Sequence, residues 1–332
     1  MAVNNTKAKV YKTADQDEAT KKKLENDLKK DLKVFFEQLA SDFAVIYSST
    51  GKVMTMTESY QDELNALLKK HYREVSKKFD YRTRKMLDEE IDTDIYEIVP
   101  EAKQNLEKKV AMAIGAFILL RAKNISPKIS STTQDEMLKQ TQDYIINQAR
   151  RGIAVSNAEI ASTVSDHIKK WGVAHSETVS TTEVQAVAER TKKIESATVN
   201  QAVTEEAERI KSGGKVNQYD TKPPHEYSRD EINEINEIES LANDIDIGEG
   251  ATKTWITSGD EKVRSSHLAL DGVTIGQDEL FVTENGSRLM YAGDMENGAL
   301  LKDVINCRCS TVYRYDNDVV KMYRNSIYRR KM

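Results

Sequence analysis

The chain has 332 residues, of which 31% are charged, and a formal net charge of only −5. This charge balance excludes a basic nucleic-acid coat protein, and no stretch approaches the roughly 20 consecutive apolar residues that cross a bilayer. Two cysteines are too few for a disulfide framework, so we expect a reducing compartment.

Helical periodicity dominates the first two-thirds of the chain. Apolar residues recur at steps of three and four over residues 24–46 and 60–79, which places them on one face of each helix. The apolar run 110–120 is predicted to be a buried helix. Further helices are predicted over 133–151, ending at Gly152, and over 157–172, beginning at a Ser156 or Asn157 cap and ending at Gly172.

The longest predicted helix covers residues 181–210. Val184, Val187 and Ile194 belong to a thin apolar stripe on it, while Ala, Glu and Thr dominate the other positions. Such a stripe is typical of a helix that packs along another helix or an extended partner.

The character of the sequence changes after residue 211. Gly-Gly, Pro-Pro and polar residues over 212–228 predict a linker or exposed loop. After residue 250, "KTWITS" predicts a strand and "DEKVRSSHLAL" a short helix. The Asp271-Gly272 turn leads into the strand "VTI", Asn285-Gly286 predicts a type I′ hairpin turn, and "VINCRCSTVYRY" predicts a last strand.

These elements predict an α+β protein: a predominantly α-helical, extended N-terminal region followed by a small C-terminal α+β domain. The predicted boundaries are 1–211 for the helical region, 212–228 for the linker, 229–317 for the α+β domain and 318–332 for a basic C-terminal tail.

The two cysteines lie two positions apart in the last predicted strand. On a strand, Cys307 and Cys309 share one face and Arg308 points to the other. Their spacing is poor for a mutual disulfide, and the C-x-x-C turn of a redox pair is absent. Zinc is an alternative, with Cys307, Cys309 and His267 as ligands. A fourth ligand would then come from Asp260, His225 or elsewhere.

We favour a structural interpretation of this region, with the cysteines as small apolar side chains packed beneath the sheet and with no bound metal or other cofactor. Asp260, Arg264 and His267 fall at i, i+4 and i+7 and can line one helix face. Arg264 would then pair with Asp260 or Asp271 in a buried network that ties the helix to the sheet, and Arg308 would form a similar pair on the opposite face.

No catalytic residue is predicted, and we expect no enzymatic activity. The sequence lacks G-x-S-x-G, H-E-x-x-H, P-loop and G-x-G-x-x-G motifs. His267, Asp260 and Cys307 could form a nucleophile–base–orienter set, and Glu237 and Glu239 have the spacing of a transferase motif. Glu237 and Glu239 lie in a helical pattern, however, where a solvated helix face is the simpler interpretation.

The segment "WITSGDEKVRSSHLALDG", then "AGD", then "VINCRC" resembles the signature of the phage Mu F-like minor head proteins, a head-morphogenesis family of tailed bacteriophages. The resemblance covers roughly residues 250–315. The matching positions are Trp255, Asp260, Arg264, His267, Asp271, Gly272, Gly293, Asp294, Asn306, Cys307, Arg308 and Cys309. Two helical stretches, "LNALLKKHYREVSKKF" and "AERTKKIESATVNQA", resemble the family more loosely. Many members have C-x-x-C where this chain has Arg264-Ser-Ser-His267, and many have proline in place of Ala292.

The resemblance implies a structural virion component of the phage head interior, near the portal, that acts in procapsid assembly or in DNA packaging and delivery. The implied partners are the portal protein and, further, the major capsid or scaffolding protein. The protein would be in the host cytoplasm during assembly, with no membrane in the mature particle. The alternative is an ejected internal virion protein with ADP-ribosyltransferase-like, nuclease-like or DNA-binding activity.

The basic tail is a separate feature of the sequence. It interleaves basic and aromatic side chains, which can hold phosphates and stack on bases, so packaged DNA is one candidate partner. Docking on the portal and a solvated terminal helix are the alternatives. The basic residues concerned are Lys321, Arg324, Arg329, Arg330 and Lys331.

Overall fold

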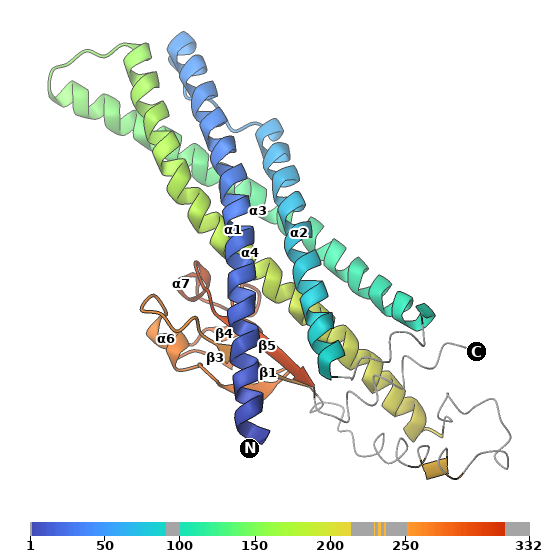
Figure 1. Cartoon of the computed structure of the whole chain (residues 1–332). Helices are drawn as coiled ribbons and strands as arrows, with labels where there is room; N and C mark the ends of the chain where they lie inside the picture. The colour runs from blue at the N-terminus through green and yellow to red at the C-terminus, as the bar shows by residue number, and fades with distance from the viewer. Residues whose placement is uncertain are drawn as a thin grey trace. The chain divides into compact units, whose positions relative to one another are not determined.

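The computed structural model describes residues 2–90, 100–213 and 251–315, together with residues 229, 232, 233 and 236. Four long helices account for most of the described chain: α1 (Ala2–Thr50), α2 (Glu58–Glu90), α3 (Pro100–Arg150) and α4 (Asn157–Lys211) (Figure 1). A small strand-containing region follows them. The predicted α+β class, mainly helical with a small C-terminal sheet region, is therefore confirmed.

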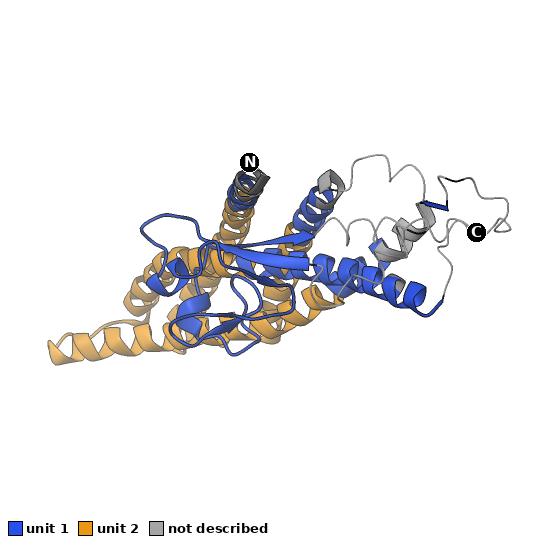
Figure 2. Cartoon of the chain, turned by 90° about the horizontal axis from the view of Figure 1, so that it is seen from below, with its two compact units in different colours: residues 1–18, 76–115, 185–332 blue, residues 19–75, 116–184 orange. Residues whose placement is uncertain are grey.

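The helices divide between two compact units (Figure 2). Unit 1 contains residues 1–18, 76–115 and 185–332, and unit 2 contains residues 19–75 and 116–184. Each unit therefore takes one segment from each of the four long helices. These units do not follow the predicted domain boundaries, which stay a prediction.

Unit 2 is a helical bundle with an apolar core. The predicted stripes on α1 and α2 supply buried residues, as do α3 and α4. Those buried residues include Leu28, Leu32, Phe35, Phe36, Leu39, Phe43, Leu64, Leu68, Tyr72, Ile118, Met137, Ile160, Val164 and Ile168. A buried ionic group lies among them, because Arg121 donates two hydrogen bonds to Glu183, at 2.7 and 3.1 Å, and the Tyr72 hydroxyl donates a third at 2.5 Å.

The predicted helix ends are partly correct. The helix predicted to end at Gly152 does end there, since α3 stops at Arg150 and Gly152 has φ +69°. Ser156 caps α4 as predicted, because its hydroxyl accepts the Glu159 N–H and the Glu159 carboxylate accepts the Ser156 N–H. The predicted stop at Gly172 is wrong. A Cβ at that position would lie 2.6 Å from the Phe36 Cβ, so the glycine allows close packing within a continuous helix.

The apolar run 110–120 is buried on one face only. Val110, Ile114 and Ile118 are buried, whereas Leu119 and Leu120 are exposed. By length and composition alone, the part of α3 from Glu107 to Arg150 could cross a membrane. In this structure, 28% of its most apolar 18-residue stretch is buried. The helix is therefore confirmed, but the prediction that it is buried is correct for only three of its eleven residues.

Unit 1 contains the small sheets. Strand β1 (Ala251–Ile256) lies between β2 (Thr274–Gly276) and β5 (Ser310–Tyr315), antiparallel to both. A two-stranded sheet pairs β3 (Phe281–Val282) with β4 (Arg288–Leu289). Two short helices, α6 (Ser265–Leu268) and α7 (Leu301–Val304), lie between strands.

The hairpin between β3 and β4 has a longer loop than the sequence predicted. The Thr283 N–H donates to the Ser287 carbonyl at 3.0 Å, which leaves the three residues 284–286 in the loop. Only Gly286 of this loop has a positive φ, +82°, whereas a type I′ turn needs two such residues. The predicted type I′ turn is therefore wrong, although the hairpin itself is present.

Candidate functional site

The twelve positions that carry the family resemblance all lie in the described part of unit 1. Trp255 is on β1, His267 is on α6, and the two cysteines lie in the extended segment between α7 and β5. The cysteines thus precede the strand on which they were predicted. Their side chains nevertheless share one side, since both are buried while Arg308 is partly exposed.

Cys307, Cys309 and His267 form a buried cluster. The His267 Nδ1 atom lies 3.5 Å from the Cys309 Sγ atom and 3.8 Å from the Cys307 Sγ atom. The exposed fractions of the three residues are 1% for His267, 1% for Cys307 and 2% for Cys309. The Trp255 ring packs edge-on against the imidazole, with ring centroids 5.2 Å apart.

The two sulfurs also belong to the apolar core of the small sheet region. This core contains Trp255, Leu270, Phe281, Leu289, Ala292, Cys307 and Cys309. The predicted packing of the cysteines in an apolar interior is therefore correct. The contact of His267 with both sulfurs was expected only in the zinc alternative, since the favoured interpretation placed His267 on a helix face with Asp260 and Arg264.

This arrangement affects the acidity of the Cys307 thiol. Hydrogen bonding with Cys309 and the neighbouring His267 hold the pKa of Cys307 well below its usual range, although burial acts in the opposite direction. A thiol with a lowered pKa can serve as a metal ligand or as a nucleophile. Because all three side chains are buried, the geometry suits an enclosed ligand set better than an open reaction centre.

Other motif positions shape the backbone around the cluster. A Cβ at Gly293, where φ is +80°, would lie 2.9 Å from the Gln185 Cγ atom. This close approach lets the Gln185 amide donate to the carbonyls of Ala292 and Cys309, at 3.2 and 2.7 Å. Asn306 has φ +55°, a left-handed conformation that turns the chain immediately before Cys307.

The motif aspartates Asp271 and Asp294 hold turns. The Asp271 carboxylate accepts the Thr257 N–H at 2.8 Å and the Tyr11 hydroxyl at 3.0 Å. The Asp294 carboxylate accepts the backbone N–H groups of Met290 and Glu296, at 2.7 and 2.8 Å. Both carboxylates therefore fix local backbone geometry.

The predicted ionic network is wrong in its pairing. The Asp260 carboxylate accepts the Lys262 N–H in a turn, and α6 begins only at Ser265, so Asp260 and Arg264 do not share a helix face. Arg264 instead donates to the Ile305 carbonyl, and Asp260 pairs with Arg308 at 2.6 Å. The side chains of Arg308 and Asp260 are 26% and 40% exposed, so this ion pair is not buried.

Replacing Arg308 by methionine is expected to lower the free energy of unfolding by less than about 1 kcal/mol, because partly exposed ion pairs contribute little. Urea denaturation of both proteins measures the difference. A loss well above that value would show that the ion pair is a major structural tie of the small sheet region.

Asp303 is a buried acidic residue that the sequence interpretation missed. Its carboxylate accepts hydrogen bonds from Ser266, Asn285 and Ser287, at 3.1, 3.3 and 2.6 Å. Burial raises the pKa of Asp303, but these hydrogen bonds outweigh that effect and lower it. The signal in the sequence was an aspartate inside the apolar stretch "LLKDVI", where a charge needs several partners.

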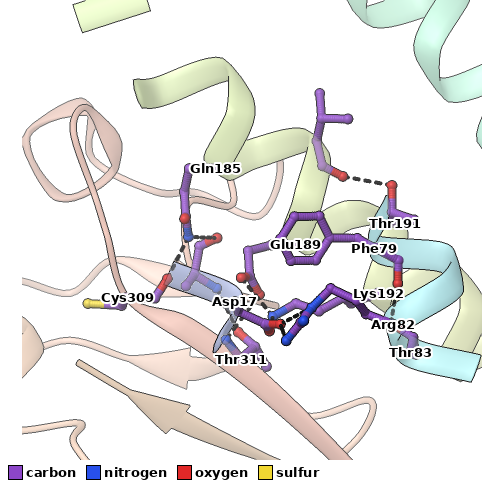
Figure 3. A network of polar contacts seen from close by, with 12 residues as sticks. Asp17, Phe79, Arg82, Thr83, Gln185, Glu189, Thr191, Lys192, Cys309 and Thr311 are labelled. Atoms are coloured by element: carbon purple, nitrogen blue, oxygen red, sulfur yellow. Dashed lines mark hydrogen bonds and ion pairs between the residues drawn. The ribbon is translucent and has the colours of Figure 1, made fainter. Parts of the chain in front are cut away.

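A second missed feature is a polar network around α4 in unit 1 (Figure 3). Lys192 contacts Asp17 at 2.9 Å and Glu189 at 2.8 Å, and the Glu189 carboxylate also accepts the Thr311 N–H of β5 at 3.0 Å. Arg82 provides a second ion pair to Asp17 at 2.8 Å. The buried side chains of Glu189 and Lys192 on α4 therefore bind the backbone of β5 and Asp17 of α1.

The apolar stripe predicted on α4 is not a free surface. Val184 and Val187 are fully buried, and Ile194 is partly buried. Of the two predicted alternatives, packing along another helix fits this burial, whereas contact with an extended partner is wrong for the two valines because the chain itself covers them.

Some predicted residues lie outside the part of the chain that the structure describes. They are the candidate zinc ligand His225, the transferase-like pair Glu237 and Glu239, and the tail residues Lys321, Arg324, Arg329, Arg330 and Lys331. Their proposed roles stay predictions.

Comparison with known proteins adds no relative to these observations. No protein-family model, no curated protein sequence and no solved structure matches this chain.

Proposed function

We propose that this chain is a structural minor head protein of a tailed bacteriophage, located inside the head near the portal. A single observation carries the proposal. The twelve positions that resemble the family, spread over 55 residues from Trp255 to Cys309, all lie in the small sheet region.

The roles of these positions favour a structural protein over an enzyme. Trp255 fills a core, Gly293 allows a close approach, and Asp294 holds a turn. A motif of this kind specifies a shape, whereas a catalytic motif is expected to direct reactive groups toward a cleft. The absence of catalytic activity stays part of the proposal.

The long helices support the same function. The four helices have 49, 33, 51 and 55 residues, which gives the chain extended helical surface for contact with other subunits. We propose the portal protein as the main partner, with the major capsid or scaffolding protein as further candidates. The basic tail would bind packaged DNA, and a portal groove is its alternative target.

A gene-deletion experiment in the phage that encodes this chain tests the proposal. Mass spectrometry of purified wild-type particles is expected to detect the protein in few copies. Deletion of the gene is expected to reduce the yield of DNA-filled heads, and expression of the chain from a plasmid is expected to restore it. Electron microscopy of lysates measures head assembly directly.

Two outcomes would contradict this function. If the protein is absent from purified particles and deletion leaves the phage titre unchanged, the chain is not a head component. If deletion leaves normal DNA-filled heads that eject DNA but cannot complete infection, the delivered-protein alternative is favoured instead.

A further inference from the structure

We propose that His267, Cys307 and Cys309 bind a zinc ion. This inference goes beyond the proposed function and does not depend on it, since it rests on the geometry of three side chains. Their donor atoms all lie within 4.8 Å of one another.

The distances between the donor atoms fit a tetrahedral zinc site. Zinc lies about 2.3 Å from cysteine sulfur and about 2.0–2.1 Å from histidine nitrogen, so a tetrahedral angle places sulfur and nitrogen about 3.6 Å apart. The two distances from the His267 Nδ1 atom, 3.5 Å to Cys309 and 3.8 Å to Cys307, lie on either side of that value.

Hydrogen bonding alone explains this geometry less well. The Nδ1 atom of an imidazole has either one proton or one lone pair, so it can form one good hydrogen bond. Two sulfurs nevertheless lie within 4 Å of the Nδ1 atom of His267. A single ion in front of Nδ1 would contact both sulfurs at once.

The charge balance of the proposed site suits its surroundings. Binding would release one proton from each thiol, and the two resulting thiolates would neutralise the two charges of Zn²⁺ while the imidazole stays neutral. A site of zero net charge is compatible with the apolar core formed by Trp255, Leu270 and Phe281. Thiolate and imidazole are also ligand types that suit zinc, whereas calcium and magnesium prefer oxygen.

The backbone already holds the ligands in place. The Cys307 N–H donates to the Val304 carbonyl at 3.1 Å, the Cys309 carbonyl accepts the Gln185 amide at 2.7 Å, and the His267 N–H donates to the Arg264 carbonyl at 3.0 Å. The described residues supply three donors. Water would complete the tetrahedron.

Metal analysis of the full-length protein tests the site. Protein purified without chelators from zinc-supplemented cells is expected to contain about one zinc per chain. Removing a residue that only hydrogen-bonds a zinc ligand lowers zinc affinity roughly 10–100-fold. Cys309→Ser and His267→Gln each remove a ligand itself, so they are expected to lower the affinity further. His175→Gln, which removes a histidine of unit 2, is the matched control and is expected to keep the zinc.

A second measurement on the unmodified protein guards against variants that fail to fold. After removal of zinc, addition of Co²⁺ is expected to give the visible bands of tetrahedral cobalt and a thiolate-to-cobalt charge-transfer band. The absence of that charge-transfer band would overturn the proposal. So would a zinc content that is the same in the unmodified protein, in Cys309→Ser and in His267→Gln.

Discussion

Replacing Lys192 by methionine is expected to lower the free energy of unfolding of unit 1 by about 3 kcal/mol. Lys192 is 5% exposed and forms ion pairs with Asp17 and Glu189, which are themselves 3% and 0% exposed. Methionine fills a similar volume but leaves the Glu189 carboxylate without its nearest cation. We expect a loss of stability at the lower end of the usual range for breaking a buried ion pair, because Asp17 keeps its ion pair with Arg82.

The measurement needs a reporter that is specific to unit 1. The chain has two tryptophans, Trp255 in unit 1 and Trp171 in unit 2. In a Trp171→Phe background, tryptophan fluorescence during urea unfolding therefore reports on the environment of Trp255 alone. The fluorescence transition gives the free energy of unfolding of the part of the chain that holds the small sheets.

The partly exposed ion pair between Arg308 and Asp260 gives the matched control, because both residues belong to unit 1. Their side chains are 26% and 40% exposed. Arg308→Met is expected to lower the free energy of unfolding by less than about 1 kcal/mol. If Lys192→Met costs no more than this control, the network around Asp17, Glu189 and Lys192 is not the anchor that the geometry indicates.

The sequence predicted the helices of unit 2 well because their apolar stripes are continuous. Residues 24–46 and 60–79 repeat apolar side chains every three or four positions, and most of these side chains are buried, although Ile46 is exposed. The predicted helix ends were less accurate. Gly172 carries the usual signal for a helix end, but its meaning depends on Phe36, 136 positions away in the sequence.

The sequence could not predict which polar residues of α4 are buried. Glu189 and Lys192 have the composition of a solvated helix face, and periodicity cannot distinguish a solvated charge from a buried pair. Their burial depends on Asp17 and on the Thr311 backbone, both distant in sequence. The burial of Val184 and Val187 fits one predicted alternative for the thin apolar stripe, packing along another helix, and contradicts the other, contact with an extended partner.

The candidate metal site was partly predictable for a similar reason. Alternation along an extended chain placed both sulfurs on one side of the backbone and Arg308 on the other. The contact with His267 joins residues about 40 positions apart, so no local pattern determines it. The predicted ion pair between Arg264 and Asp260 was wrong because the residues before Ser265 form a turn and not the helix that the sequence predicted.

Glu195→Gln is expected to remove a pH dependence of about 2–4 kcal/mol from the free energy of unfolding of unit 1. The pKa of Glu195 is raised from 4.5 to about 8, chiefly by burial and also by the nearby Asp80 carboxylate, although Arg84 acts in the opposite direction. The Arg84 guanidinium lies between three carboxylates, those of Asp80, Glu107 and Glu195, at 3.0, 2.9 and 3.2 Å. One cation cannot neutralise all three, so the buried Glu195 keeps a proton.

The direction of the effect follows from proton binding. Between pH 4.5 and about 8 the folded protein holds a proton on Glu195 that the unfolded chain releases. The stabilisation is fully present below pH 4.5, and raising the pH through about 8 removes it. Glutamine keeps the shape of the side chain and cannot ionise, so the variant should not lose this stability as the pH rises. From pH 5 to pH 8.5, the free energy of unfolding of the variant should therefore increase relative to that of the unmodified protein.

Urea unfolding at several pH values, in the same Trp171→Phe background, measures this difference. Glu208→Gln is the matched control, because Glu208 lies on the same helix with an exposed side chain and the substitution makes the same change from carboxylate to amide. A difference for Glu195→Gln that stays constant with pH would mean that Glu195 is ionised in the folded protein. The guanidinium of Arg84 would then stabilise all three carboxylates as anions, which requires more solvent around them than the 4% exposure of Glu195 indicates.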